Sequence, residues 1–325
     1  MLCVLFLVNL SLGSVAIPFK EVLKNLFGVP MTNTNWEYIL HDYRMPKAIT
    51  SMLVGAGLGI SGLLMQTLFR NPLAGPFVLG ITSGASLGVA LTILGSSAFG
   101  IALLAYSKWN VIIAASLGSF LVLLAVIAVS SKIRDTMAIL IIGLMFASIT
   151  SSVVSVLSYF SSAEALQQYV FWGFGSLGNL SWSEVNMLTV LVAIGFVICI
   201  FLIKKLDALL LGDNYAQSLG VGLKKTRLLV IIATSLLAGT ITAFAGPIAF
   251  IGLAVPHLAR ILFSTASHKI LLPATLLLGA IVLLICDAIA QVPFTSFTLP
   301  INAVTSLFGA PIIIWLLVRK RKLNF

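Results

Sequence analysis

Residues 62–84 read GLLMQTLFRNPLAGPFVLGITSG, two apolar runs separated by a short break that starts at Arg70. The break contains Asn71 and Pro72, and both residue types favour turns, because Asn hydrogen-bonds nearby backbone and Pro fixes φ. The first run extends back to about residue 47, and the second extends to about residue 95. Each run therefore has the length of about 20 residues that a membrane-spanning helix needs. The stretch predicts two membrane helices joined by a tight connector.

Composition extends this interpretation to the whole chain. Of its 325 residues, 60 % are hydrophobic and 9 % are charged, whereas soluble domains have about 45–50 % apolar and about 25 % charged residues. Such a chain cannot cover a water-facing surface with polar groups, which excludes a cytosolic enzyme, a secreted domain and a disordered chain. The apolar residues, about 195 of them, are enough for roughly ten spans of about 20 residues each.

Ten apolar runs can be located between breaks that are charged or rich in Pro, Gly and Asn. The first run could be a cleaved signal peptide, but no Lys or Arg precedes it and it lacks a clear small-residue cleavage motif. We therefore interpret it as a span. The ten runs lie at about 1–17, 47–68, 76–95, 111–130, 137–159, 186–203, 228–245, 248–263, 270–290 and 303–318.

Charge gives these spans a direction. Ten spans place both termini on one side, and if that side is the cytoplasm, 14 of the 19 Lys and Arg residues lie in cytoplasmic segments and 5 in outer ones. Cytoplasmic loops of membrane proteins are enriched in Lys and Arg. Topology therefore explains the net charge of +10, and no nucleic-acid partner is needed. The sequence predicts an all-α polytopic membrane protein, with one transmembrane domain over residues 1–325 and both termini cytoplasmic.

Small residues and an internal echo suggest how the helices pack. Glycines recur at short helical spacing at 55, 59 and 62 and again at 80, 84 and 88, a pattern that lets membrane helices approach closely. Ala74-Gly75-Pro76 opens one span, and Ala245-Gly246-Pro247 opens a span five helices later that runs the opposite way. This echo favours a five-plus-five inverted repeat. Chance is the alternative, because Pro is common at helix starts.

Several motifs are absent from the sequence. It contains no G-x-x-x-x-G-K-[ST] and no H-E-x-x-H, and no paired carboxylates stand out, so we expect neither ATP hydrolysis nor another enzymatic activity in this chain. The three cysteines all lie in apolar runs without a Cys/His cluster, which predicts no disulfide framework, no metal site and no bound cofactor. Asp287 is the one acidic residue within an apolar run, which disfavours a proton-driven carrier.

Five stretches carry a resemblance to a known family. They are Arg44-Met45-Pro46-Lys47, residues 62–84, LLGDNYAQSLGV at 210–221, GPIAFIGLAVPHLAR at 246–260, and GAPIIIWLL from Gly309. Together they resemble the FecCD family, the bacterial inner-membrane permeases of type II ABC importers for iron–siderophores, haem and cobalamin. The resemblance implies ten helices with both termini in the cytoplasm. It also implies a second permease subunit, either a copy of this chain or a related permease, with the substrate pathway between the two. The further partners are two cytoplasmic ATPase subunits and an extracytoplasmic substrate-binding protein.

The expected cargo is an iron(III)–siderophore complex, with haem and cobalamin as alternatives from the same family. Two other classes are kept open. One is an ATP-independent secondary carrier or channel, and the other is a membrane receptor or scaffold that captures a binding protein without transport.

The resemblance also implies a docking site for the binding protein at Arg44 and Lys47, on the outer side. Simple anchoring of these long side chains at the lipid headgroups is the alternative. Gln291 stands where the family often has another Arg, and Thr298 stands where it has a Glu. These departures predict an outer surface with a different charge pattern from that of the family.

Within a cytoplasmic loop at about 206–227, Gly212-Asp213 and Leu219-Gly220 are start and stop signals for a short helix. An ordinary capped loop helix is one interpretation. The resemblance makes this segment the coupling helix that seats in the ATPase and transmits its closure. The candidate coupling residues are Leu211, Gly212, Asp213, Ala216, Leu219 and Gly220.

The remaining candidates concern the pathway and its gate. Asn71 and Pro72 form the rigid inner connector, and Pro256 precedes His257 inside a span, where a satisfied polar role for the imidazole is more common than a ligand role. The fifth span is rich in hydroxyls. Ser and Thr in spans usually bond to their own helix, but a weakly polar wall would also suit a bulky chelate. The pathway candidates in that span are Ser151, Ser152 and Ser155.

Overall fold

The computed structural model describes residues 1–95, 107–130, 136–292, 295 and 297–318. Over these residues the chain is helical, and no β-strand is present in the described part. The elements are α1 (Leu2–Ser11), α2 (Phe19–Leu26), α3 (Thr34–Ile39), a π-helical turn η1 (Leu40–Arg44), α4 (Met45–Phe69), a 3-10 turn η2 (Pro76–Leu79), α5 (Ile81–Ala90), a π-helical turn η3 (Leu91–Gly95), α7 (Lys108–Ser130), α8 (Thr136–Phe160), α9 (Ala163–Gly173), α10 (Trp182–Leu210), α11 (Asp213–Ser218), α12 (Leu223–Ala245), α13 (Ile251–Phe263), α14 (His268–Ala290) and α15 (Ile301–Val318).

Each of the ten apolar runs coincides with a helix of the structure. Among the described residues, six helices are long and apolar enough to cross a membrane, namely Thr34–Phe69, Lys108–Val129, Ile141–Phe160, Trp182–Leu210, Leu223–Ala245 and His268–Ala290. Four apolar helices are shorter: Leu2–Ser11, Ile81–Gly95, Ile251–Phe263 and Ile301–Trp315. The polytopic all-α class is confirmed. Ten crossings and two cytoplasmic termini stay predictions, and six of the basic residues used for that topology, Lys132, Arg134 and 319–322, lie outside the described residues.

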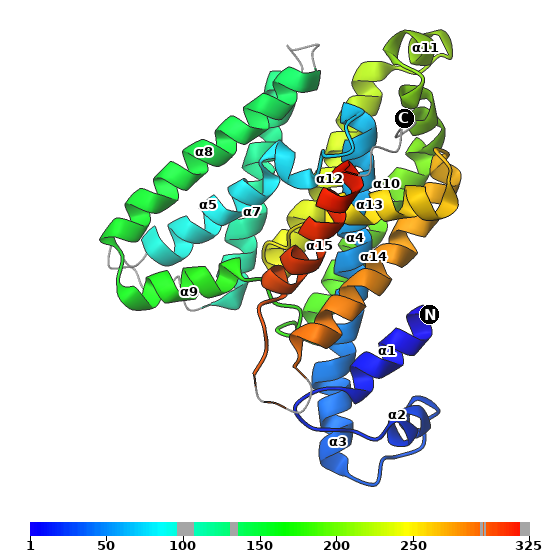
Figure 1. The fold of residues 1–325 in the computed structure, drawn as a ribbon. Helices are drawn as coiled ribbons and strands as arrows, with labels where there is room; N and C mark the ends of the chain where they lie inside the picture. The colour runs from blue at the N-terminus through cyan, green and yellow to red at the C-terminus, as the bar shows by residue number, and fades with distance from the viewer. Residues whose placement is uncertain (96–106, 131–135, 293–294, 296, 319–325) are drawn as a thin grey trace.

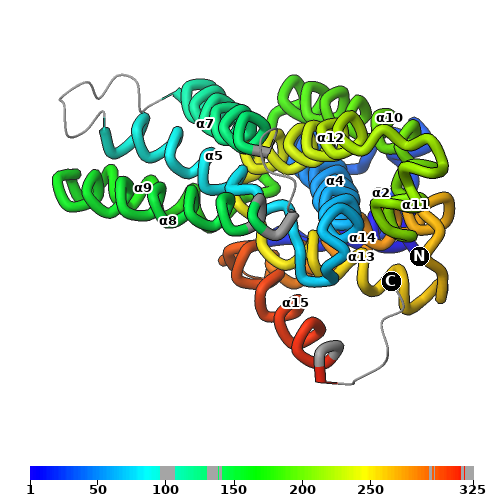
Figure 2. Tube along the Cα trace, turned by 90° about the horizontal axis from the view of Figure 1, so that it is seen from above, coloured from blue at the N-terminus to red at the C-terminus, as the bar shows by residue number. Residues whose placement is uncertain are grey.

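Helix α4 forms the centre of the molecule. It packs against α10, α12, α13 and α14, and both views show these four helices around it (Figures 1 and 2). Every residue from Val54 to Phe69 is buried. A helix that is apolar all round is a core helix. The stretch at 62–84 therefore begins in the buried half of α4.

Glycines set the distances between these helices. A Cβ atom built on Gly55 would lie 2.1 Å from the Gly279 carbonyl oxygen, which places α4 and α14 backbone against backbone. A Cβ on Gly84 would lie 2.5 Å from the Gly118 carbonyl oxygen, where α5 crosses α7. The predicted role of these small residues in close helix packing is therefore confirmed.

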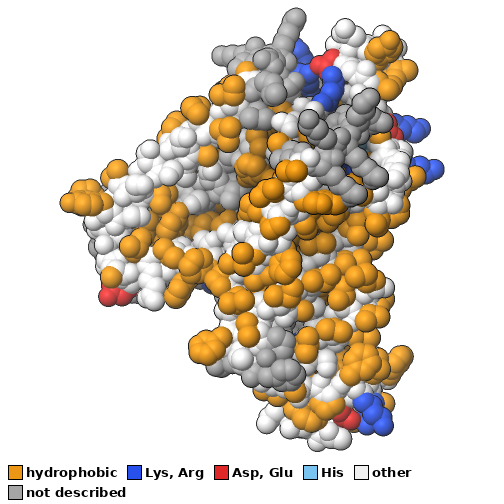
Figure 3. All heavy atoms as spheres, viewed as in Figure 1, with side chains coloured by type: hydrophobic (Ala, Val, Ile, Leu, Met, Phe, Trp, Pro, Cys, Tyr) orange, Lys and Arg blue, Asp and Glu red, His pale blue; other side chains and the backbone are white. Residues whose placement is uncertain are grey.

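A second group of helices packs on one side of the central bundle. Helices α5, α7, α8 and α9 form a lobe at the left of Figure 1, and α7 joins this lobe to the bundle by packing against α12 (Figure 2). Helix α8 is the most exposed long helix, since only 11 % of its apolar window is buried inside the chain. Hydrophobic side chains cover the middle of the molecule and charged ones gather toward its ends (Figure 3), as expected for a protein that crosses a membrane.

The two Ala-Gly-Pro repeats at 74–76 and 245–247 have similar structural surroundings. After Pro76 the chain makes the η2 turn and passes through Gly80, with φ of 71°, before the 10-residue helix α5 starts. After Pro247 it passes through Phe250, with φ of 65°, before the 13-residue helix α13 starts. Both repeats are therefore followed by a residue in the left-handed backbone conformation and then by a short helix. The five-plus-five inverted repeat stays a prediction.

Candidate functional sites at the two ends of the bundle

The predicted coupling segment, residues 211–220 with α11, projects from one end of the bundle (Figure 1). We call this segment the knob. Gly212 adopts φ of 106° and turns the chain from α10 into α11, a conformation that favours glycine. Ala216 is fully buried and packs with Ala208 and Leu209 on the end of α10. The knob is thus held to the bundle by a small apolar contact of its own.

The outer surface of this knob is apolar. Leu211, Tyr215 and Leu219 are 61 %, 70 % and 65 % exposed, and we call them the knob patch. Tyr215 lies in α11 and Leu219 caps its end one turn later, which places these two on one side of the helix, whereas Leu211 precedes the Gly212 turn. Leu211 and Leu219 were predicted from the sequence, but Tyr215 was missed, although it lies four residues before Leu219.

Asp213 is held by two guanidinium groups. Arg70 Nη2 lies 2.5 Å from Asp213 Oδ1, and Arg227 Nη2 lies 2.6 Å from Oδ2. Arg70 Nε also donates to the Leu209 carbonyl oxygen at 3.0 Å. The sequence predicted Asp213 only as a favourable charge at a helix start. The two arginines were missed, because nothing in the local pattern links Arg70 to a loop 143 residues away.

The inner connector has the predicted local structure. The Leu73 backbone N–H donates to Asn71 Oδ1 at 2.9 Å, which closes a turn around Pro72. Pro256 lies inside α13 and has no N–H to donate to the Gly252 carbonyl. That carbonyl oxygen lies against Gly62 of α4, where an added Cβ would come within 1.7 Å of it. The carbonyl that Pro256 leaves without its helical donor therefore lies where α13 and α4 pack backbone against backbone.

His257, next to Pro256, is 6 % exposed. The described residues contain no group of three or more His, Cys, Asp and Glu side chains that could hold a metal ion. Among these residues, His257 is therefore not part of such a group.

The serines of α8 bond to their own helix. Ser152 Oγ donates to the Ser148 carbonyl at 3.0 Å, and Ser155 Oγ donates to the Ser151 carbonyl at 2.8 Å. Ser151, Ser152 and Ser155 all lie on the exposed side of α8. Back-bonding of this kind was the alternative weighed for these residues, and it leaves a weakly polar surface.

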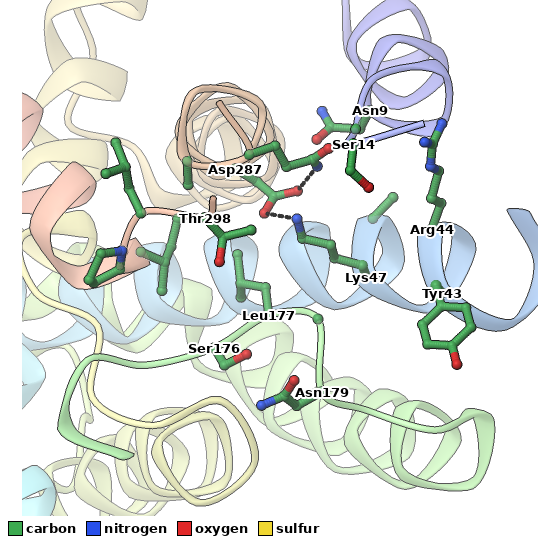
Figure 4. Close-up of a pocket in the computed structure, with 18 of the residues that line it drawn as sticks. Asn9, Ser14, Tyr43, Arg44, Lys47, Ser176, Leu177, Asn179, Asp287 and Thr298 are labelled. Carbon is green, nitrogen blue, oxygen red and sulfur yellow. Dashed lines mark hydrogen bonds and ion pairs between the residues drawn. The ribbon is translucent and has the colours of Figure 1, made fainter. Parts of the chain in front are cut away.

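At the opposite end of α4, a cavity of about 780 Å³ is bounded by α4, α14, the N-terminal segment, the loop at 174–179, Thr295 and residues 298–301. Lys47 Nζ lies 3.0 Å from Asp287 Oδ1, and Gln291 Nε2 donates to Asp287 Oδ2 at 3.0 Å (Figure 4). Two predicted docking residues, Lys47 and Gln291, therefore meet on one carboxylate. Asp287 was missed as part of this site, although it was recognised as the one acidic residue in an apolar run.

Arg44 lines the same cavity but is 9 % exposed. Its guanidinium donates to the carbonyl oxygens of Leu10 at 2.8 Å and Ser11 at 2.9 Å, and also to that of Val15. These donors bind carbonyls at and just after the end of α1, where helical partners are missing. Docking by Arg44 stays a prediction, and in this structure the side chain holds the N-terminal segment.

The FecCD transport family matches residues 1–319. This chain belongs to the FecCD family. The permease is 34 % identical over 287 residues to the vitamin B12 import system permease protein BtuC of Citrobacter koseri, which covers 88 % of this chain and 84 % of that protein. It is 33 % identical over 323 residues to the hemin transport system permease protein HmuU of Yersinia pestis, covering 99 % and 94 % of the two chains.

Solved structures show the same fold. The permease matches an inward-facing metal-chelate type ABC transporter with a TM-score of 0.85 and 31 % identity, over 98 % of this chain and 96 % of that one. PsaBC from Streptococcus pneumoniae matches with a TM-score of 0.57 and 16 % identity, over 86 % and 92 % of the two chains, and this likeness concerns the fold alone. The chain is thus an ABC importer permease of the bacterial inner membrane and not an enzyme, and ATP hydrolysis belongs to a separate subunit.

Proposed function

We propose that this permease carries iron(III)–siderophore complexes inward as one of two permease subunits, most simply two copies of this chain, forming the pathway between them. Haem and cobalamin are the alternatives, since the relatives named above import hemin and vitamin B12. The whole of residues 1–325 would act as one permease domain that binds no cofactor. The likeness to a metal-chelate transporter over 98 % of the chain is the observation that carries this proposal.

The knob patch supports an ATPase partner at the α11 end. Leu211, Tyr215 and Leu219 expose apolar side chains on a short element that projects from the bundle. Exposed apolar side chains grouped in this way mark interaction surfaces. Gly212 and Gly220, with φ of 106° and 81°, allow the turns on either side of α11. We infer that the knob seats in a cleft of the ATPase and receives its movement.

Helix α8 supports a shared pathway. Most of its apolar window is not buried by the rest of this chain, and the exposed surface contains Ser151, Ser152 and Ser155 among apolar neighbours. Hydroxyls that are already bonded to their own helix offer few free donors, so a bulky chelate would pass without strong binding. We infer that the exposed side of α8 faces the pathway and the second permease subunit.

Reconstituted vesicles test the transport proposal. The permease, its ATPase and its binding protein are assembled, and uptake of a ferric siderophore, haem and cobalamin is measured with and without ATP. We expect ATP-dependent uptake, with the siderophore complex as the preferred cargo. Uptake driven by an ion gradient without the ATPase would refute the proposal, and capture of the binding protein without any uptake would favour a receptor.

Single cysteines along residues 148–158 test the pathway. We expect a water-soluble thiol reagent to label the positions around Ser151 and Ser155, and we expect cargo-loaded binding protein to slow that labelling. Equal labelling rates with and without cargo at every position would argue against a pathway along α8. The matched control is a cysteine at Ile194, a residue 47 % exposed on α10, where cargo should have no effect.

A further inference from the structure

A carboxylate at the start of α11 is paired with the bundle. Asp213 accepts from Arg70 at 2.5 Å and from Arg227 at 2.6 Å. Arg70 lies at the end of α4, and Arg227 lies in the first turns of α12. Because each arginine belongs to a different helix, Asp213 connects the knob to two long helices at once. We call Arg70, Asp213 and Arg227 the clamp.

The backbone of Arg70 gives a second, independent observation. Arg70 ends α4 with φ of 45° and ψ of 40°, the left-handed conformation. Helices commonly end in this way, but usually with Gly or Asn, because other side chains are disfavoured there. Non-glycine residues in this conformation cluster at functional sites. Here the disfavoured backbone places a guanidinium where it reaches both Asp213 and the Leu209 carbonyl oxygen.

The helix behind Arg70 is suited to transmit displacement. Helix α4 has 25 residues, so it is about 37 Å long at about 1.5 Å per residue. It is buried along most of that length. Its other end contains Lys47, which is paired with Asp287 at the outer cavity. One rigid helix thus runs from the clamp to the predicted docking surface for the binding protein.

We propose that the clamp is the contact through which movement of α11 reaches α4 and α12, and that Arg70 is its main positioning residue. This inference rests on the proposed function, because it assumes that an ATPase moves the knob. It separates two tasks at the α11 end. The knob patch captures the ATPase, and the clamp passes the movement on to the transmembrane helices.

The assembled importer in nanodiscs tests this division. Arg70→Gly removes the guanidinium while suiting the left-handed backbone, and Asp213→Asn weakens the clamp from its other side. Lys225→Ala is the matched control, because Lys225 is an exposed cation two residues from Arg227. For each variant, four quantities are measured: thermal unfolding midpoint, ATPase bound per permease, basal ATP hydrolysis, and hydrolysis and uptake stimulated by loaded binding protein.

We expect Arg70→Gly to keep its unfolding midpoint, its bound ATPase and its basal hydrolysis. Stimulated hydrolysis and uptake should fall at least about fivefold, the lower limit of typical coupling between two sites. Asp213→Asn should show the same split, and Lys225→Ala should resemble the wild type. Full stimulation in both clamp variants would overturn the proposal, as would a loss of uptake that only follows a loss of bound ATPase. A wild-type complex without ATP-dependent uptake would instead overturn the proposed function.

Discussion

The Lys47–Asp287 pair provides a quantitative test of how the outer end of the permease is built. The two charges lie 3.0 Å apart, and the side chains are 21 % and 3 % exposed. Coulomb's law with an effective dielectric constant of about 20 gives an attraction of roughly 5.5 kcal/mol at this distance. Burial of the two charges offsets part of this attraction, so the net value of the pair is smaller.

Removing one partner costs more than the net value of the pair, because the other charge is left buried alone. We predict that Lys47→Met lowers the free energy of unfolding by about 3–5 kcal/mol, since it leaves the Asp287 carboxylate with only the Gln291 amide as a partner. Asp287→Asn should cost less, because the more exposed Lys47 ammonium can turn toward water in the cavity. The double variant should be more stable than Lys47→Met alone.

The assay is thermal unfolding in one detergent, followed by intrinsic fluorescence. With an unfolding entropy of about 2.1 cal/mol/K per residue, a loss of about 3–5 kcal/mol corresponds to a fall in the midpoint of roughly 4–7 °C for a chain of 325 residues. Lys20→Met, at an exposed position of α2, is the control for loss of a cation and should leave the midpoint unchanged. Two results would refute the reasoning: a larger loss in Asp287→Asn than in Lys47→Met, or strictly additive losses in the double variant.

Two further predictions concern packing and partner capture. Gly62→Ala should reduce the yield of folded permease severely, because its Cβ would lie 1.7 Å from the Gly252 carbonyl oxygen. Overpacking alone costs about 1–3 kcal/mol. Gly173→Ala is the control, since no atom lies within 4 Å of the added Cβ. Equal yields by size-exclusion chromatography would contradict this packing. Tyr215→Ala should weaken ATPase binding at least about fivefold without changing the unfolding midpoint, since truncating a buried aromatic interface residue commonly costs over about 1 kcal/mol. Gln217→Ala on the same helix should bind like the wild type in a pull-down titration, and equal binding by both variants would exclude the knob patch as the contact.

Much of the fold followed from local pattern. The apolar runs located ten helices, and the spacing of glycines such as Gly55 and Gly84 identified the faces that now make backbone contacts. The segment around Gly212-Asp213 was correctly predicted as a short helix with a start and a stop. These features depend on residues within a few turns of one another, which is why one sequence was enough to predict them.

The sites needed contacts between distant segments. Arg44 seemed available to an external partner until the structure placed the end of α1 around its guanidinium. Lys47 seemed to be a second docking cation until Asp287 was found beside it. In each case the neighbour that changes the interpretation comes from another helix, and local sequence contains no information about which helix that is.

By itself, the sequence determined the membrane class, the helices, the small-residue faces and the family. Only the tertiary structure decided which charged side chains pair with each other. Those pairs in turn decide which side chains stabilise the fold and which remain exposed to partners. The physical reason is the range of the interactions. Apolar burial and helix capping act along a few turns of one segment, whereas Arg70 and Asp213 meet across 143 residues because α4 and α10 end at the same level of the bundle.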